Sequence, residues 1–216
     1  MLQIEAKPCL VVGGGQVAER RIHALLDAGA HVRVVSPRYT ERIEDWVSTG
    51  RIQGVRRPYE PGDERGAVLV VAATNDPKVN DEVCHRARAA GCLVNHAGEP
   101  EQGDFIVPSV MRRGKLLVAV STSGAAPSVA AELRRRIESA IGEDMEAYLD
   151  AVSDLRSMIR QVVADPAKRQ QWLKECLKQD ISGLIRNGQL EQWKQQWQQR
   201  MSEANHANHS GRDEAK

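Results

Sequence analysis

The sequence predicts an α/β fold: a Rossmann-like domain with a parallel sheet, followed by a dimerisation segment and a helical C-terminal domain. Three observations support it. A glycine-rich turn follows the first apolar run, apolar runs then alternate with helical patterns as far as residue 95, and only helical patterns occur beyond residue 144. Alternating strand and helix signals indicate parallel strands joined by crossover helices. We therefore expect a doubly wound nucleotide-binding sheet in the first half.

The first half supplies the elements of this sheet in order. Strands are expected at 8–12, 31–35, 52–55, 67–73 and 92–95, and helices at 20–28, 41–48 and 78–90. Gly29 and Gly91 end two of these helices, because glycine readily adopts the left-handed conformation that closes a helix. The run 67–73 is apolar throughout, which is typical of a central strand covered on both faces.

The second half has a different pattern. After a polar loop, two strands are expected at 105–107 and 115–121, with a turn at 112–115, and then a helix at 128–141. Beyond residue 144 the pattern is helical, with breaks at Pro166 and Gly188. The expected parts are a nucleotide-binding domain (1–112), a dimerisation strand and helix (113–143), a helical domain (144–202) and a disordered polar tail (203–216).

Composition and charge narrow the functional class. The 216 residues carry a net charge of +1, which argues against general attraction to nucleic acid or to an anionic membrane. No apolar run approaches the roughly 18 residues of a membrane helix, and nothing near Met1 resembles a signal peptide. The four cysteines are scattered without metal-site spacing, so we expect reduced thiols in a cytoplasmic protein and no bound metal.

The turn at residues 13–18 predicts a dinucleotide cofactor. It follows the first strand and opens the first helix, which is the context that a phosphate-binding turn requires. The glycines let the backbone approach a pyrophosphate, the helix amides face the anion, and Ala18 lets the helix pack on the strand. Thr74 and Asn75 follow the central strand, in the crevice where open parallel sheets bind ligands, although a helix cap would use the same residues.

The choice of nucleotide depends on the end of the second strand. An NAD site ordinarily has an acid about 20 residues past the glycines, which holds the ribose hydroxyls. Here that place is Ser36-Pro37-Arg38, in which Ser36 can bond a ribose and Arg38 can attract a 2′-phosphate. NAD is the expected cofactor, and NADP stays open. The expected cofactor-binding residues are Gly13, Gly15, Gln16, Val17, Ser36, Pro37, Arg38, Thr74 and Asn75.

Five motifs in order resemble one family; they lie at 11–21, 34–37, 72–76, 105–109 and 118–127. Together they resemble the precorrin-2 dehydrogenase family, which includes the amino-terminal module of siroheme synthases. The resemblance implies NAD-dependent oxidation of precorrin-2 to sirohydrochlorin in siroheme biosynthesis, by a homodimer whose subunits exchange contacts after the nucleotide domain. Some members also insert ferrous iron, and some carry a fused methyltransferase, which we expect this chain to lack as a stand-alone form.

The resemblance implies that basic residues after position 111 bind the carboxylates of the substrate. Precorrin-2 is rich in carboxylates, so its pocket needs fixed positive charge and hydrogen-bond donors. Arg112 and Arg113 are the expected cations, and Thr122, Ser123 and Gly124 form a loop before a helix that offers backbone amides. The alternatives are a solvated helix face for the basic residues and a helix cap for the loop.

Oxidation also requires a base or a water molecule that takes a proton. In iron-inserting members an aspartate follows the strand that ends here at Asn95, and the matching position is Gly98. Glu99 and Asp104 are the expected catalytic substitutes, with His96 as a further possible base; both acids could instead be solvated loop residues. The change to Gly98 argues against iron insertion more than against oxidation. A bifunctional dehydrogenase and ferrochelatase and a non-catalytic NAD sensor remain as alternatives.

Overall fold

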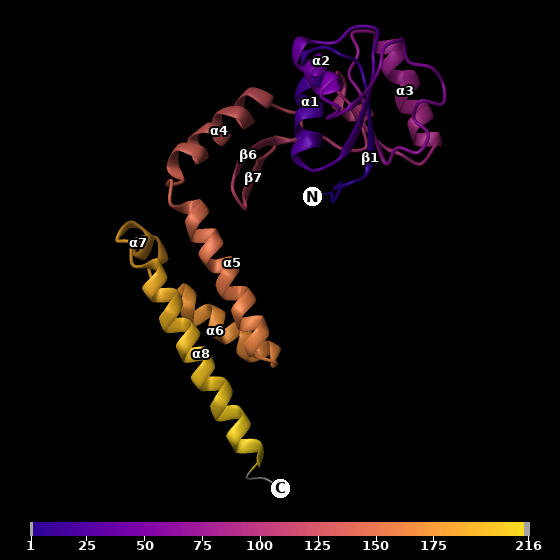
Figure 1. Ribbon diagram of the computed structural model, residues 1–216. Coiled ribbons are helices and arrows are strands. Elements are labelled where there is room, and N and C mark those ends of the chain that lie inside the picture. The colour runs from indigo at the N-terminus through magenta and orange to yellow at the C-terminus, as the bar shows by residue number, and fades with distance from the viewer. Residues whose placement is uncertain (1, 214–216) are drawn as a thin grey trace. The chain divides into compact units, whose positions relative to one another are not determined.

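The computed structural model describes residues 2–213. By its internal contacts the chain divides into two compact units, Met1–Val107 and Pro108–Lys216. Figure 1 shows the strands and helices of the first unit in indigo to magenta and those of the second in rose to yellow. The hairpin expected to straddle the domain boundary therefore lies wholly in the second unit.

The first unit is a five-stranded parallel sheet with the order β3-β2-β1-β4-β5. Its strands are β1 (Pro8–Val12), β2 (His31–Val35), β3 (Gln53–Val55), β4 (Leu69–Ala72) and β5 (Leu93–His96). Its helices are α1 (Gln16–Asp27), α2 (Glu41–Ser48) and α3 (Pro77–Ala89), with a short 3₁₀ helix η1 (Pro100–Gln102). The predicted fold class is confirmed: the strand order reverses between β1 and β4, as in a doubly wound sheet.

The two faces of this sheet have separate cores. Cys9 and Val11 of β1 pack with residues of α1 and α2, whereas Leu10 and Val12 pack with residues of α3. Successive side chains of a strand point to opposite faces, so a strand covered on both sides is apolar throughout. Figure 1 shows α1 and α2 on one side of the strands and α3 on the other.

Two polar side chains begin the helices next to the carboxyl edge of the sheet. The Thr40 hydroxyl accepts a hydrogen bond from the N–H of Ile43 at 3.4 Å, which caps α2. The Asp76 carboxylate accepts one from the N–H of Lys78 at 2.9 Å, which caps α3. These caps fix where the loops after β2 and β4 end.

The second unit combines a hairpin with helices. Strands β6 (Ser109–Arg113) and β7 (Leu116–Val120) are antiparallel, and α4 packs on both. The helices are α4 (Pro127–Ala140), α5 (Met145–Val162), α6 (Pro166–Leu177), α7 (Ile181–Arg186) and α8 (Leu190–Asp213). Leu155 and Ile159 of α5 are buried against Trp193 and Trp197 of α8. None of the helices in residues 2–213 is long and apolar enough to cross a membrane.

The structure differs from the expected elements at three places. No strand forms at 105–107, because Phe105 packs against the core of the first unit and its carbonyl accepts from the Asn95 side chain at 2.9 Å. The helical region has an unexpected break where Asp180 caps α7. Helix α8 runs to Asp213, through most of the segment expected to be disordered, and residues 214–216 lie outside the described part.

Candidate functional site

A cleft of about 590 Å³ opens at the carboxyl ends of β1, β2 and β4. This is the point of the sheet where the strand order reverses and where open α/β sheets bind ligands. Predicted cofactor-binding residues that line it are Gly13, Gly15, Ser36, Pro37, Arg38, Thr74 and Asn75. Gln16 and Val17, which begin α1, are exposed but do not line the cleft.

The glycine turn is in close contact with the loop after β2 and with the end of β4. Gly13 has a φ of +121°, and a Cβ there would lie 2.3 Å from the carbonyl oxygen of Ala73. A Cβ at Gly14 would lie 1.9 Å from the carbonyl oxygen of Arg38. Any side chain at these positions would collide with backbone, so the turn requires glycine there. Gly14 was missing from the predicted set, although its signal was present in the run of three glycines.

The turn also leaves an anion site at the start of α1. Gly15 is exposed, has nothing within 4 Å of an added Cβ, and is the N-cap residue of α1 without a side-chain cap. The first N–H groups of a helix have no partner within the helix, and they carry its positive dipole end. The structure therefore offers the cradle that a pyrophosphate fits.

The loop after β2 is tied to this turn. The Ser36 hydroxyl donates to the carbonyl oxygen of Arg38 at 2.8 Å, and the N–H of Thr40 donates to the carbonyl oxygen of Gly14 at 3.0 Å. The Ser36 hydroxyl oxygen also accepts from the N–H of Arg38 at 3.5 Å, so Ser36 is engaged within the loop both as donor and as acceptor. The Arg38 side chain is exposed and makes no ion pair with the described side chains, those of residues 2–203.

On the other side, Thr74 is held by a buried amide. The Asn80 side chain, on a residue only 4% exposed, accepts from both the N–H and the hydroxyl of Thr74, at 2.9 and 2.8 Å, and donates to its carbonyl at 3.1 Å. Asn75 is exposed at the cleft, and Asp76 serves as the helix cap. The helix cap thus falls on Asp76, next to the predicted cofactor-binding residues Thr74 and Asn75.

The loop between β3 and β4 forms a further wall of the cleft, which the sequence motifs did not predict. Tyr59 lines the cleft, and its hydroxyl donates to Glu64 at 2.6 Å. The Arg57 guanidinium donates twice to the Asp63 carboxylate, each time at 2.8 Å, and the N–H of Glu60 adds a third bond at 2.9 Å. The bonds from Arg57 hold the pKa of the Asp63 carboxyl below its usual range. These contacts close the loop that carries Tyr59.

The two predicted catalytic acids are placed differently in the loop after β5. The Asp104 carboxylate accepts from Arg88 Nε and from the N–H of Val94, both at 2.9 Å. The bond from Arg88 holds the pKa of the Asp104 carboxyl below its usual range. Through its bond to Val94, this acid links the loop to β5. Glu99 is half-buried and accepts from the neutral Gln102 amide at 2.6 Å. Neither acid lines the cleft.

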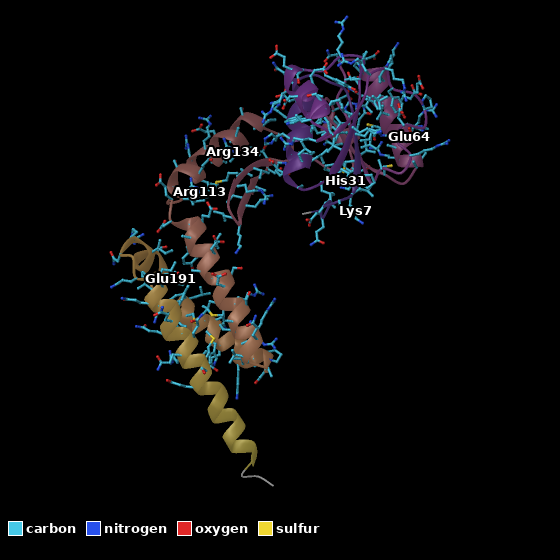
Figure 2. The ribbon with its side chains drawn as sticks, viewed as in Figure 1. Lys7, His31, Glu64, Arg113, Arg134 and Glu191 are labelled. Carbon is cyan, nitrogen blue, oxygen red and sulfur yellow. The ribbon has the colours of Figure 1, made fainter. Side chains whose placement is uncertain are left out.

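The predicted substrate-binding residues lie in the second unit, where Figure 2 labels Arg113 and Arg134. Arg113 donates to the carbonyl oxygens of Ile141 and Gly142 at 2.7 and 2.8 Å, which caps the end of α4. Arg112 is exposed and has no ion pair within the described chain. The remaining basic residues of this segment, Lys115, Arg134, Arg135 and Arg136, are each paired with an acid.

The loop before α4 is strained and partly capped. Ser123 and Gly124 have φ values of +52° and +88°, and Ser123 is a non-glycine residue in the left-handed region. The Thr122 hydroxyl accepts from the N–H of Ala126 at 3.1 Å, while Ala126, the N-cap residue of α4, gives no side-chain cap. The first turn of α4 thus has backbone amides that no side chain caps.

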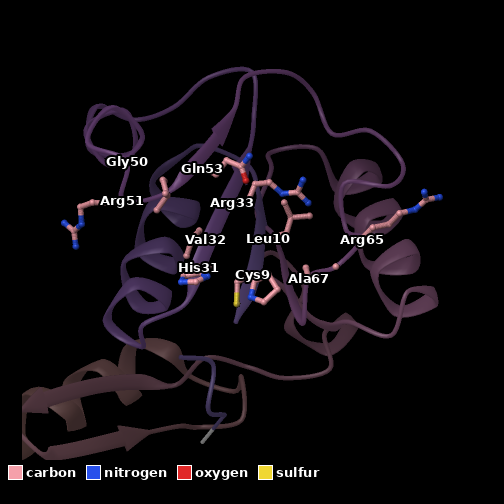
Figure 3. A pocket seen from close by; sticks show the side chains of 13 residues that line it. Cys9, Leu10, His31, Val32, Arg33, Gly50, Arg51, Gln53, Arg65 and Ala67 are labelled. Atoms are coloured by element: carbon pink, nitrogen blue, oxygen red, sulfur yellow. The ribbon is translucent and has the colours of Figure 1, made fainter. Parts of the chain in front are cut away.

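A second cavity, of about 440 Å³, lies at the opposite end of the sheet (Figure 3). It is lined by residues at the starts of β1, β2 and β3, among them Cys9, His31 and Gln53. Figure 3 shows Arg51 and Arg65 extending away from the cavity to opposite sides. Ligands of open parallel sheets bind at the carboxyl ends of the strands, so the first cleft is the candidate site.

Among the side chains that the structure describes, those of residues 2–203, no three of His, Cys, Asp or Glu gather in a way that could hold a metal ion. His96, the third possible base, is at the end of β5 with a side chain only 1% exposed. Its Nε2 atom has no hydrogen-bond partner in the described chain and lies 3.5 Å from a carboxylate oxygen of Asp81.

Comparison with known proteins adds independent evidence. An NAD(P)-binding family matches residues 1–109, and the central domain of sirohaem biosynthesis proteins matches residues 113–140. The chain is 37% identical to a siroheme synthase of Nitrosococcus oceani over 191 residues, which are 88% of this chain and 41% of that protein. It is also 37% identical to a siroheme synthase of Methylobacillus flagellatus over 201 residues, 93% of this chain and 43% of that protein.

A solved structure is similar over nearly the same share of the chain. SirC, a precorrin-2 dehydrogenase, is 28% identical, and the superposition covers 92% of this chain and 98% of SirC with a TM-score of 0.78. The chain thus spans about two fifths of the length of the curated relatives and nearly all of SirC.

Proposed function

The chain belongs to the precorrin-2 dehydrogenase and siroheme synthase family, and from this premise we propose that it oxidises precorrin-2 to sirohydrochlorin with NAD. The observation that carries the proposal is the cleft at the switch point of the sheet, with its glycine turn and the uncapped start of α1. The similarity to SirC supplies the substrate class.

The chain's own residues bind and orient the reactants. The glycine turn and the start of α1 bind the pyrophosphate, the loop 36–38 lines the adenosine, and Thr74 and Asn75 form the opposite wall. NAD, when bound, accepts the hydride that precorrin-2 loses. The proton that leaves the substrate in the same overall reaction goes to a carboxylate or to water.

Between the two predicted acids, Glu99 is the proposed proton acceptor. Its carboxylate is half-buried and has one bond, from a neutral amide, so it can still gain a proton. Both oxygens of Asp104 are occupied by N–H donors, and its lowered pKa disfavours protonation. Asp104 is therefore assigned to holding the loop after β5.

The carboxylates of precorrin-2 are proposed to bind the second unit. Arg112 is the primary cation, because Arg113 is engaged in capping α4 and Arg112 has no partner in the described chain. The amides of Thr122 and Gly124 add donors beside the start of α4, whereas the N–H of Ser123 already donates to the Ser121 hydroxyl at 3.1 Å. Charge-assisted bonds from arginine suit this carboxylate-rich substrate.

A cytoplasmic homodimer is the proposed working form. Val110 of β6 and Val129 and Leu133 of α4 are 42%, 50% and 41% exposed, so this unit presents apolar side chains to solvent. A second copy would cover them. All four cysteines are free and buried, and burial raises the pKa of the Cys9 thiol to about 11, which suits a reducing compartment.

One assay tests the activity. Purified protein is mixed with precorrin-2 and NAD without oxygen, and NADH is followed by its absorbance. NADH should form only with protein present. NAD binding without NADH formation would support a non-catalytic sensor instead. Ferrous iron added after oxidation tests the bifunctional alternative; because Gly98 replaces the aligned acid, we expect insertion no faster than without protein.

A further inference from the structure

We propose that this cleft accepts NADP as well as NAD, and that Arg38 is the residue that binds the 2′-phosphate. The inference rests on the proposed function, because it concerns the same nucleotide cleft. It begins at the end of β2, where sheets of this topology hold the adenosine ribose.

The wall of the cleft at β2 lacks a group that would repel the phosphate. The acids that line the described cleft, Asp76 and Glu82, both lie on the β4 side. Asp76 caps α3, and Glu82 pairs with Arg86 at 2.9 Å. Dinucleotide sites that select NAD use an acid at the end of β2, and rejection of a competing ligand often needs such a repulsive element. Here Ser36 and Arg38 occupy that place.

The backbone of Arg38 is fixed against the glycine turn. Its carbonyl oxygen accepts from the Ser36 hydroxyl at 2.8 Å and occupies the space where a Cβ of Gly14 would be. The residue therefore starts from a defined point beside the pyrophosphate cradle. Its exposed side chain is free to reach a phosphate on the neighbouring ribose, and a guanidinium matches the geometry of phosphate oxygens.

The neighbouring cations are already engaged. Arg42 lies 3.9 Å from the Glu19 carboxylate, and Arg56 is paired with Glu44. Arg38 lines the cleft, and its charge has no partner among the described side chains of residues 2–203. An added phosphate would gain a counter-charge there without breaking an existing pair.

Calorimetric titration of the purified chain with NAD and with NADP, at one ionic strength, tests the inference without turnover. The wild type should bind the two nucleotides within about ten-fold of each other. Arg38→Ala should weaken NADP binding about ten-fold more than NAD binding, as expected for a lost charge-assisted bond. Arg38→Lys should keep most of the NADP affinity. The matched control is Arg51→Ala, which removes another exposed, unpaired arginine at the amino end of the sheet and should leave the ratio unchanged.

The outcomes separate this inference from the proposed function. A wild type that binds NAD but not NADP, or an Arg38→Ala variant that loses both affinities equally while unfolding at the wild-type temperature, overturns the role of Arg38 and leaves the proposed oxidation standing. Binding of neither nucleotide overturns both proposals.

Discussion

The Nδ1 atom of His96 accepts a hydrogen bond from the backbone N–H of Glu99 at 2.8 Å. An accepting Nδ1 leaves the ring proton of a neutral imidazole on Nε2, which faces the Asp81 carboxylate. The buried ring therefore links the end of β5 to the backbone of the proposed proton acceptor.

Replacement of His96 should lower the stability of the fold. His96→Leu leaves the N–H of Glu99 without its acceptor, so we expect a loss of about 1–3 kcal/mol in the free energy of unfolding, measured in urea. The control, His23→Leu, removes an exposed histidine that pairs with Asp27 at 3.0 Å and should cost less than about 1 kcal/mol. Equal losses in the two variants would contradict the role of His96.

Substitution of Glu99 and substitution of Asp104 should have different effects on turnover and stability. Glu99→Gln should lower kcat about ten-fold or more, with little change in stability, because general base catalysis contributes at least that much. Asp104→Asn should lower stability and leave kcat of the folded protein within about two-fold. Unfolding curves and steady-state rates of both variants measure the difference. If turnover is undiminished in Glu99→Gln, the proton that leaves precorrin-2 must go to water and not to Glu99.

The glycine turn should tolerate a methyl group at one position and not at another. Gly14→Ala places a Cβ against the carbonyl oxygen of Arg38, so the turn must move and NAD binding should fall about 100-fold or more. Gly15→Ala meets open space, and its stability should stay within about 0.5 kcal/mol of the wild type. Calorimetry with NAD and thermal unfolding measure the two effects.

The Arg57–Asp63 pair should make stability depend on acid pH. The pKa of Asp63 is lower in the folded than in the unfolded chain, so its stabilisation is present above the unfolded value of about 3.8 and is lost as pH falls through the folded value. Asp63→Asn should cost about 2 kcal/mol at pH 7, a figure that allows for the partly exposed Arg57, and much less near pH 2. Urea unfolding at several pH values checks the slope.

A matched control for this pair is Glu60→Gln. The Glu60 side chain is 66% exposed and lies 3.7 Å from Arg57, so its loss should change stability by less than about 0.5 kcal/mol. The same Asp63→Asn variant should raise the KM for NAD, because the pair closes the loop that holds Tyr59 at the cleft. An unchanged KM would show that the loop keeps its position without the pair.

Arg112 should determine substrate affinity. Arg112→Ala should raise the KM for precorrin-2 about ten-fold, through loss of a charge-assisted bond to a carboxylate, with kcat changed less. Arg135→Ala removes an exposed arginine that is paired with Glu132 and should leave the KM within about two-fold. Similar KM values in the two variants would remove Arg112 from the substrate site.

The fold and the family could be predicted from the sequence because their signals are local. The apolar run of β4 and the glycines after β1 each identify an element within a few residues, and the five motifs match a known order. The strand predicted at 105–107 was wrong because the side chain of Phe105 and the amide of Asn95 decide that segment, and neither contact is visible in local periodicity.

Residues that line the cleft could be predicted from the sequence only where they belong to a recognisable motif. The glycine turn and the loop at Ser36 were predicted to bind the cofactor, and both line one cleft; their role in binding stays a prediction. Tyr59 carries no motif, since its position depends on pairing between Arg57 and Asp63 in three dimensions. The difference between Glu99 and Asp104 likewise depends on Arg88, a residue of another element.

The bond between the N–H of Thr40 and the carbonyl oxygen of Gly14 joins two neighbouring loops that line the cleft. With the Ser36 bond, it fixes the wall that is proposed to line the adenosine. Little conformational entropy is then lost on that side when a nucleotide binds. Association should consequently behave as a single fast step, without a slow ordering phase after the first encounter.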